Sequence, residues 1–179
     1  MAQQPQTRRP VFAGRVFDVG IEEHLLPNGR RAEFEVVHHV GGAAVLPRLD
    51  DGRLLLIRQF RPAVGAMVYE IPAGRIDPGE APRDCARREL EEETGYRAGR
   101  IESLGGMLSA VGYCDEYVAL FFADSLQKTR QALEPDEIVE LAPMTLDAAL
   151  DKLLAGEIAD SKTQIALLRL ALREQGGGR

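Results

Sequence analysis

The stretch GRIDPGEAPRDCARRELEEETGY, from Gly74 to Tyr96, decides the fold of this chain. Pro78-Gly79 is a suitable opening for a helix, and Gly95 is a natural helix terminator. We therefore predict a helix that runs from Pro78-Gly79 to about Glu93. The chemistry of the chain is concentrated on one edge of this helix.

Three carboxylates share that edge. A helix advances about 100° per residue, so Glu89 and Glu93 lie roughly 40° apart and Glu92 lies roughly 60° to the other side of Glu89. Like charges four residues apart cost a few tenths of a kcal/mol, roughly, unless a cation lies between them. Mg²⁺ takes a few carboxylate oxygens together with water and substrate phosphates. The pattern predicts a site for a divalent cation, although a solvated acidic helix face has the same pattern.

Two neighbouring features favour the cation site over the solvated face. Cys85, Ala86 and Leu90 form an apolar stripe beside the carboxylates, so the acidic edge borders packed structure. Ala73-Gly74 precedes the helix, and a glycine permits close approach of the backbone, so a carbonyl there can join the metal ligands.

This stretch resembles the Nudix box, G-x5-E-x7-R-E-U-x-E-E-x-G-U, in which U is a bulky apolar residue. Tyr96 fills the last U with an aromatic ring. Farther out, LLLIRQFRP (54–62), YEIPAG (69–74) and residues 136–170 resemble the ADP-ribose pyrophosphatase branch of the family, so the resemblance covers roughly residues 11–170. The matching box positions are Gly74, Glu80, Arg88, Glu89, Leu90, Glu92, Glu93 and Gly95.

The resemblance implies an α/β fold, the Nudix α/β/α sandwich around a mixed sheet, with an N-terminal antiparallel β extension. The extension is expected at residues 1–40 and the Nudix hydrolase domain at residues 41–174. In this branch the N-terminal strands are exchanged between two subunits, and a β-rich segment before the core would otherwise leave edges unpaired. A homodimer is therefore expected.

The resemblance also implies the metal site and its chemistry. Mg²⁺, or Mn²⁺ as an alternative, would be held by the Ala73 carbonyl, Glu89 and Glu93, with Glu92 as a further ligand, directly or through water. Arg88 would orient the carboxylates by charge-assisted hydrogen bonds, with Glu80 as one partner. Glu80 could equally stabilise the helix dipole.

In this branch the catalytic base comes from a loop after the box. The acidic run LEPDEI offers Glu134 and Glu137, and alignment of that run slightly favours Glu134. Either residue could instead be a solvated loop acid. Arg58 and Arg61 are expected to bind the substrate's phosphate or distal sugar, since arginine can form bidentate contacts. Glu70 is expected to accept hydrogen bonds from a sugar hydroxyl or a base.

The implied function is Mg²⁺-dependent hydrolysis of the pyrophosphate of ADP-ribose or a related nucleoside diphosphate sugar. Val111 stands where this branch usually has proline in Ser-Pro-Gly, so a GDP-mannose or other nucleotide-sugar pyrophosphatase is the main alternative. A catalytically inactive, nucleotide-sensing Nudix module is a second alternative. Such sensors commonly lose the glutamate ligands, which this chain retains.

The composition of the chain argues against nucleic acid and membranes as binding partners. The net charge of −6 disfavours nucleic acid, which needs a basic surface. The apolar runs are too short to span a membrane. The N-terminus lacks the apolar core of a signal peptide. Two cysteines make no disulfide framework, and the three histidines show no zinc motif. We expect a cytoplasmic enzyme whose partner is a small-molecule nucleotide.

Outside the box, alternating apolar residues and turn signals predict mostly strands. Asn28-Gly29 predicts one hairpin, and Asp51-Gly52 predicts another between strands at 42–49 and 53–60. Residues 124–136 are expected to form a loop. Further strands are expected at 11–19, 69–72, 100–107, 116–123 and 138–143, and helices at 145–155 and 160–174.

Overall fold

The structure is a computed structural model that describes residues 5–176, so the start of the expected extension, residues 1–4, lies outside the described part. The chain divides into two compact units. The N-terminal unit contains the residues up to Gly41 together with Leu108–Tyr117. The catalytic unit contains Gly42–Met107 and the residues from Val118 onward. No helix within residues 5–176 has the length and apolar content that a membrane crossing needs.

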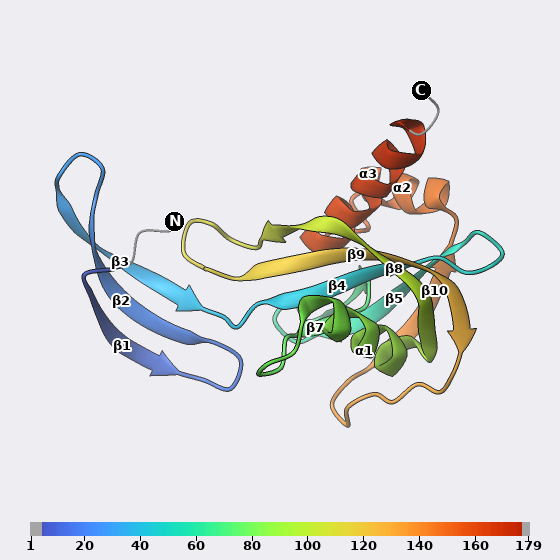
Figure 1. Cartoon of the computed structure of the whole chain (residues 1–179), viewed down its shortest axis with the longest axis horizontal. Coiled ribbons are helices and arrows are strands. Elements are labelled where there is room, and N and C mark those ends of the chain that lie inside the picture. The colour runs from blue at the N-terminus through green and yellow to red at the C-terminus, as the bar shows by residue number, and fades with distance from the viewer. Residues whose placement is uncertain (1–4, 177–179) are drawn as a thin grey trace. The chain divides into compact units, whose positions relative to one another are not determined.

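The N-terminal unit is built on an antiparallel sheet in the order β1-β2-β3 (Figure 1). The predicted hairpin between β2 and β3 is confirmed. Gly29 has a φ of 80° in its turn, a conformation that glycine adopts at little cost. The strands are β1 (Thr7–Ala13), β2 (Asp18–Leu25) and β3 (Arg31–His38).

The prediction of a single strand over residues 11–19 is wrong. A turn interrupts this run, and the backbone N–H of Gly14 donates to the Phe17 carbonyl at 3.1 Å. The rings of Phe12 and Phe17 pack across the turn with centroids 5.8 Å apart. The sequence pattern did not indicate this turn, because the residues before it belong to β1 and the residues after it belong to β2, and both have the composition of a strand.

The catalytic unit contains a mixed four-stranded sheet in the order β7-β4-β9-β8. β4 is parallel to β9 and antiparallel to β7, so the expected mixed sheet is confirmed. These strands are β4 (Gly42–Pro47), β7 (Ala73–Arg75), β8 (Tyr96–Leu108) and β9 (Tyr117–Lys128). A separate antiparallel sheet has the order β10-β5-β6, formed by β5 (Leu54–Arg61), β6 (Ala66–Glu70) and β10 (Val139–Met144).

Helices cover both faces of the mixed sheet, which confirms the α/β/α sandwich. The helices are α1 (Pro82–Thr94), α2 (Leu146–Leu154) and α3 (Ser161–Gly176). Successive side chains of a strand point to opposite faces. On β4, Ala43 and Val45 join the core cluster that contains residues of α1, whereas Ala44 and Leu46 join the cluster that contains residues of α2 and α3.

Several predicted boundaries need correction, and the strand expected at 100–107 already begins at Tyr96. The box helix begins at Pro82, because residues 77–81 form a turn in which Asp77 and Glu80 hydrogen-bond each other. The Asp51-Gly52 turn forms, but after one bridge between Arg48 and Leu54 its two strands enter different sheets. The expected loop at 124–136 is shorter, because β9 continues to Lys128.

The two C-terminal helices match their predictions within two residues. The hydroxyl of Thr145 accepts a hydrogen bond from the Ala148 backbone N–H at 3.2 Å, as expected for a helix N-cap. Asp160, which directly precedes α3, accepts hydrogen bonds from Thr163 through its carboxylate. This cap places the start of α3 beside the end of β6, where part of the site is built.

Candidate active site

Two glutamates of α1 are buried side by side. Glu93 is 2% exposed and Glu89 is 9% exposed. Burial, together with the nearby charge of Glu89, raises the pKa of Glu93 to about 8, and burial also raises the pKa of Glu89. The carboxylate of Glu93 accepts a hydrogen bond at 3.1 Å from the backbone N–H of Ala73. Two of the three carboxylates of the predicted acidic edge, Glu89 and Glu93, are therefore packed against β7, whereas the side chain of Glu92 is 42% exposed.

Gly74 provides the space for one of these carboxylates. A Cβ built at Gly74 would lie 1.8 Å from Oε1 of Glu89 and 2.1 Å from its carboxyl carbon. No side chain larger than hydrogen fits there unless Glu89 moves. The first glycine of the box is therefore required by close approach, and its φ is not in the left-handed region.

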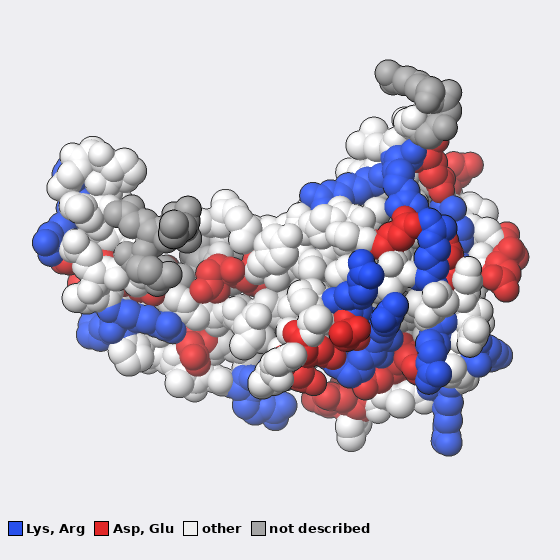
Figure 2. Space-filling view, viewed as in Figure 1, with Lys and Arg blue, Asp and Glu red and all other residues white. Residues whose placement is uncertain are grey.

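Arg88 connects the acidic residues of the box. Its guanidinium donates to Glu80 through Nε and Nη2, both at 3.0 Å, so the expected contact with Glu80 is present. Nη1 donates to Glu89 at 2.6 Å and to Glu92 at 3.0 Å. Hydrogen bonds from Arg88 lower the pKa of Glu80 to about 2. Figure 2 shows acidic and basic side chains interspersed on this face of the molecule, including over α1.

The chain that follows β9 is hydrogen-bonded to the C-terminal end of α1. The backbone N–H of Ala132 donates to the Glu92 carbonyl at 2.8 Å, and the side-chain amide of Gln131 donates to the Glu93 carbonyl at 2.7 Å. These bonds satisfy carbonyls that a helix end leaves without partners. They also bring the following acidic loop to the same end of α1 as Glu93.

Gly95 is required at this junction for two reasons. Its φ is 71°, and a Cβ there would lie 2.9 Å from the backbone nitrogen of Gln131. We expect Gly95→Ala to lower the free energy of unfolding by about 2–3 kcal/mol, since strain and a backbone clash act together. Gly156→Ala, at a φ of 78° with no atom within 4 Å of the built Cβ, should cost only about 1 kcal/mol. Urea denaturation measures both, and equal costs would contradict the role of the clash.

The acidic loop presents its two glutamates differently. The negative charge of Glu137 is among the smaller causes that raise the pKa of both Glu89 and Glu93, so it acts on the two buried carboxyls. Glu134 is exposed, and its backbone N–H donates to the Glu137 carboxylate at 2.9 Å. The structure thus brings Glu137 to the cluster and places Glu134 where its backbone holds Glu137.

Arg61 and Glu70, two of the expected substrate-binding residues, contact each other. The guanidinium of Arg61 donates to Glu70 from Nε at 2.7 Å and from Nη2 at 2.9 Å. Lys162, at the start of α3, also donates to Glu70. Sequence reasoning missed Lys162, although the DSKT segment that carries it forms part of the resemblance. Nothing in the local sequence indicates that it meets Glu70.

Arg58 does not join this cluster. Arg58 and Arg61 are three residues apart on β5, so their side chains lie on opposite faces of the strand. Arg58 donates to Glu140 of β10 at 3.1 Å and lies over the ring of Tyr69. Arg58 and Glu140 thus form a cross-strand pair within the β10-β5-β6 sheet.

The donor set suits a hard divalent cation. The buried carboxylates of Glu89 and Glu93, the carboxylate of Glu92 and the Ala73 carbonyl are all oxygen donors, the type that Mg²⁺ and Mn²⁺ prefer. The space at Gly74 admits the Glu89 carboxylate next to the backbone of β7. Within residues 5–176, no group of three or more His, Cys, Asp or Glu side chains is already arranged as a complete metal site. Arg88 supplies the positive charge at Glu89 and Glu92.

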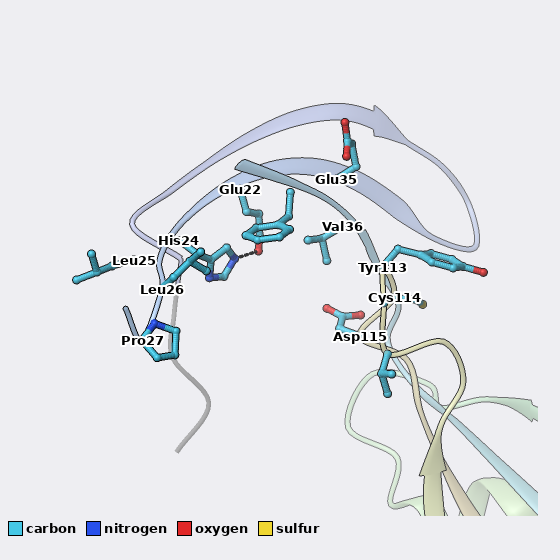
Figure 3. A pocket seen from close by; sticks show the side chains of 13 residues that line it. Glu22, His24, Leu25, Leu26, Pro27, Glu35, Val36, Tyr113, Cys114 and Asp115 are labelled. Carbon is cyan, nitrogen blue, oxygen red and sulfur yellow. Dashed lines mark hydrogen bonds and ion pairs between the residues drawn. The ribbon is translucent and has the colours of Figure 1, made fainter. Parts of the chain in front are cut away.

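The N-terminal unit has a cavity of about 440 Å³ between the β2–β3 hairpin and the Leu108–Tyr117 segment (Figure 3). A ring nitrogen of His24 lies 2.9 Å from the buried carboxylate of Glu22 at this cavity. None of the residues predicted for metal binding, catalysis or substrate binding lines it. Val111, which replaces the expected proline, does line it.

Comparison with known proteins agrees with this geometry. The NUDIX domain model matches residues 38–165. The ADP-ribose pyrophosphatase of Bacillus subtilis (strain 168) is 38% identical over 169 residues, which cover 93% of this chain and 91% of that protein. The methanol dehydrogenase activator of Bacillus methanolicus is 39% identical over 166 residues, which cover 92% of this chain and 90% of that protein.

A solved structure agrees with the fold. The crystal structure of an ADP compounds hydrolase matches with a TM-score of 0.83 at 24% identity, and the match covers 100% of this chain and 98% of that chain. At this identity the likeness bears on the fold alone. The domain match and the two relatives establish the family: the chain belongs to the Nudix hydrolases.

Proposed function

We propose that this protein hydrolyses the pyrophosphate of ADP-ribose, or of a closely related nucleoside diphosphate sugar, to a nucleoside monophosphate and a sugar phosphate. The observation that carries the proposal is the pair of buried carboxylates, Glu89 and Glu93, facing the backbone of Ala73 and Gly74. Burying two like charges is costly unless a cation compensates them. A divalent cation would compensate the two carboxylates and would at the same time bind the negative oxygens of a pyrophosphate.

In this proposal the cation is Mg²⁺, with Mn²⁺ as a substitute. Glu89, Glu93 and the Ala73 carbonyl bind it, and Glu92 is a further ligand, directly or through water. Once bound, the ion would neutralise phosphate oxygens, orient the pyrophosphate and acidify water. Arg88 orients Glu89 and Glu92 through its hydrogen bonds.

Glu137 is proposed as the base that removes a proton from the attacking water. Its charge acts on both buried glutamates, whereas Glu134 is exposed and holds Glu137 through its backbone. This assignment reverses the slight preference for Glu134 that the alignment of the acidic run gave. A base must lie within hydrogen-bond reach of the water, directly or through a second water, so proximity to the box favours Glu137.

Arg61 is proposed to bind the substrate's phosphate or distal sugar. Its side chain is 40% exposed, and Glu70 fixes the Nε and Nη2 edge of the guanidinium. The main role proposed for Glu70 is therefore to hold the guanidinium of Arg61. A hydrogen bond from Glu70 to a sugar hydroxyl would be a second role. Arg58 is a weaker candidate, because it is paired with Glu140 on the other face of β5.

ADP-ribose is favoured because the Bacillus subtilis relative, at 38% identity, is an ADP-ribose pyrophosphatase. GDP-mannose remains the alternative substrate, because Val111 leaves its loop less restrained than proline would. The nucleotide-sensing alternative is disfavoured, since every glutamate of the box is present.

A hydrolysis panel with Mg²⁺ tests the proposal. We expect cleavage of ADP-ribose to exceed cleavage of GDP-mannose, ADP-glucose, NADH and diadenosine polyphosphates in kcat/KM. A large preference for GDP-mannose would keep the chemistry and change the substrate. Cleavage of only dinucleoside polyphosphates would overturn the assignment to nucleotide sugars.

A homodimer in which the N-terminal strands pair with a second copy is part of the proposal. β1 is hydrogen-bonded to β2 along one edge and is exposed throughout its length. Val11 and Phe12 on this strand, and Val16 and Phe17 after it, are exposed apolar residues. An edge strand with apolar side chains favours pairing with another chain.

We expect sedimentation equilibrium to give the mass of a dimer for the wild type. Val11→Lys should shift the protein toward monomer, because it places a charge on the exposed strand. Val64→Lys, which makes the same substitution at an exposed position outside the N-terminal strands, is the matched control and should stay dimeric. A fully active wild-type monomer would contradict this part of the proposal.

A further inference from the structure

Glu70 lies between two cations that come from distant parts of the chain. Its side chain is only 3% exposed. Arg61 of β5 contacts both carboxylate oxygens, and Nζ of Lys162 contacts Oε2. Lys162 is itself only 14% exposed, and its second contact is with Asp160 at 3.0 Å. A partly buried lysine that contacts two carboxylates has little freedom to turn toward solvent.

The start of α3 holds Lys162 at Glu70. The Asp160 carboxylate accepts hydrogen bonds from the backbone N–H and the hydroxyl of Thr163, at 2.9 and 2.6 Å. The same hydroxyl accepts from the backbone N–H of Ile71, the residue that follows Glu70, at 2.9 Å. These bonds fasten the segment carrying Lys162 to the segment carrying Glu70.

The side chains of Arg61 and Lys162 differ in exposure, so only Arg61 is accessible to a substrate. Arg61 is 40% exposed, and within residues 5–176 its Nη1 has no hydrogen-bond acceptor. Among the described residues, Nζ of Lys162 contacts only the carboxylates of Glu70 and Asp160. Burial alone would raise the pKa of Glu70, but Arg61 and Lys162 together hold that pKa below its ordinary value.

We propose that Lys162 is a positioning residue: it fixes the Glu70 carboxylate, and through it the guanidinium of Arg61, so that the Nη1 edge is presented to the substrate's phosphate or distal sugar. This inference rests on the proposed function, because it takes Arg61 as a substrate-binding residue. Without Lys162, Arg61 would be the one cation of residues 5–176 left at the buried Glu70 carboxylate and would be drawn inward, away from the substrate.

Steady-state kinetics of Lys162→Met with ADP-ribose and Mg²⁺ tests the proposal. KM should rise by roughly tenfold to a hundredfold, as for the loss of other residues that orient a binding group, while kcat stays within about twofold. Lys162→Arg retains the cation and should restore most of the affinity. Lys128→Met makes the same substitution at an exposed position and should leave both constants unchanged.

Two readouts separate positioning from simple stabilisation. First, the KM of Lys162→Met should rise further as the pH falls, because without Lys162 the pKa of Glu70 is higher and the carboxylate is lost earlier. The wild-type KM should change less over the same range, since its Glu70 pKa is depressed. Second, in a Glu70→Gln background the further change Lys162→Met should leave KM nearly unchanged, because there is no carboxylate to hold.

The outcomes distinguish this inference from the proposed function. A wild type that is active and a Lys162→Met variant with unchanged KM would overturn the inference alone. If the wild type shows no turnover, calorimetry of ADP-ribose binding provides the test: weaker binding in Lys162→Met would support the inference while the proposed function fails. Absence of both turnover and binding would overturn both. Equal effects of Lys162→Met and Lys128→Met on KM would overturn the inference alone.

Discussion

Glu93→Gln is expected to lower turnover by roughly three orders of magnitude or more while the protein stays folded. The carboxylate of Glu93 is buried beside Glu89 and the backbone of Ala73. Its negative charge can therefore interact directly only with a cation bound between α1 and β7. A neutral amide keeps the shape and the hydrogen bond from Ala73 but removes that charge. A hard cation then loses one of its strongest ligands.

The same variant should not lower the melting temperature of the metal-free protein. Because burial raises the pKa of Glu93 to about 8, its carboxyl is largely protonated near neutral pH, and the amide replaces it with a group of the same shape and charge. Glu91→Gln is the matched control, since Glu91 lies on the same helix but is paired with Arg97. The control should retain wild-type turnover. Near-normal, Mg²⁺-dependent rates in Glu93→Gln would refute the metal assignment.

Gly74→Ala, which adds a single methyl group, should lower turnover nearly as much as Glu93→Gln. The added Cβ would lie 1.8 Å from the Glu89 carboxylate, so that carboxylate must leave its place beside β7. A displacement of about 1 Å in a catalytic group can cost roughly a hundredfold in rate, and we expect kcat to fall by at least that factor. The concentration of Mg²⁺ for half-maximal activity should rise as well.

Gly176→Ala is the control for this change, because the Cβ built there meets no atom within 4 Å and the site is at the end of α3. It should leave kcat and the Mg²⁺ requirement unchanged. If Gly74→Ala retained wild-type activity, the position of Glu89 beside the backbone would have no catalytic role. If it merely unfolded the protein, circular dichroism would reveal the cause.

The helix and its acidic edge were predictable because their signals are local, whereas the sandwich was implied by the resemblance to the Nudix box. The spacing of Glu89, Glu92 and Glu93 determines which helix edge they share. Apolar residues at successive positions of β4 indicate a strand buried on both faces. The start of α1 was predicted four residues early, because Glu80 closes a turn with Asp77 before the first helical residue.

The failures concern features that a local pattern does not contain. Lys162 and Glu70 are 92 residues apart, and only the folded chain shows that they meet. The choice between Glu134 and Glu137 depends on how the acidic loop docks on α1. Arg58 and Arg61 are an exception: their spacing of three residues on a strand already predicts opposite faces.

Mass spectrometry of the products of ADP-ribose hydrolysis, with Mg²⁺ and after its removal by a chelator, tests whether the protein cleaves this pyrophosphate with a divalent cation. We predict AMP and ribose 5-phosphate in equal amounts with Mg²⁺, no products with the chelator, and full recovery when Mg²⁺ is returned. Substrate left intact under every condition, or products formed equally well without a divalent cation, would contradict the account.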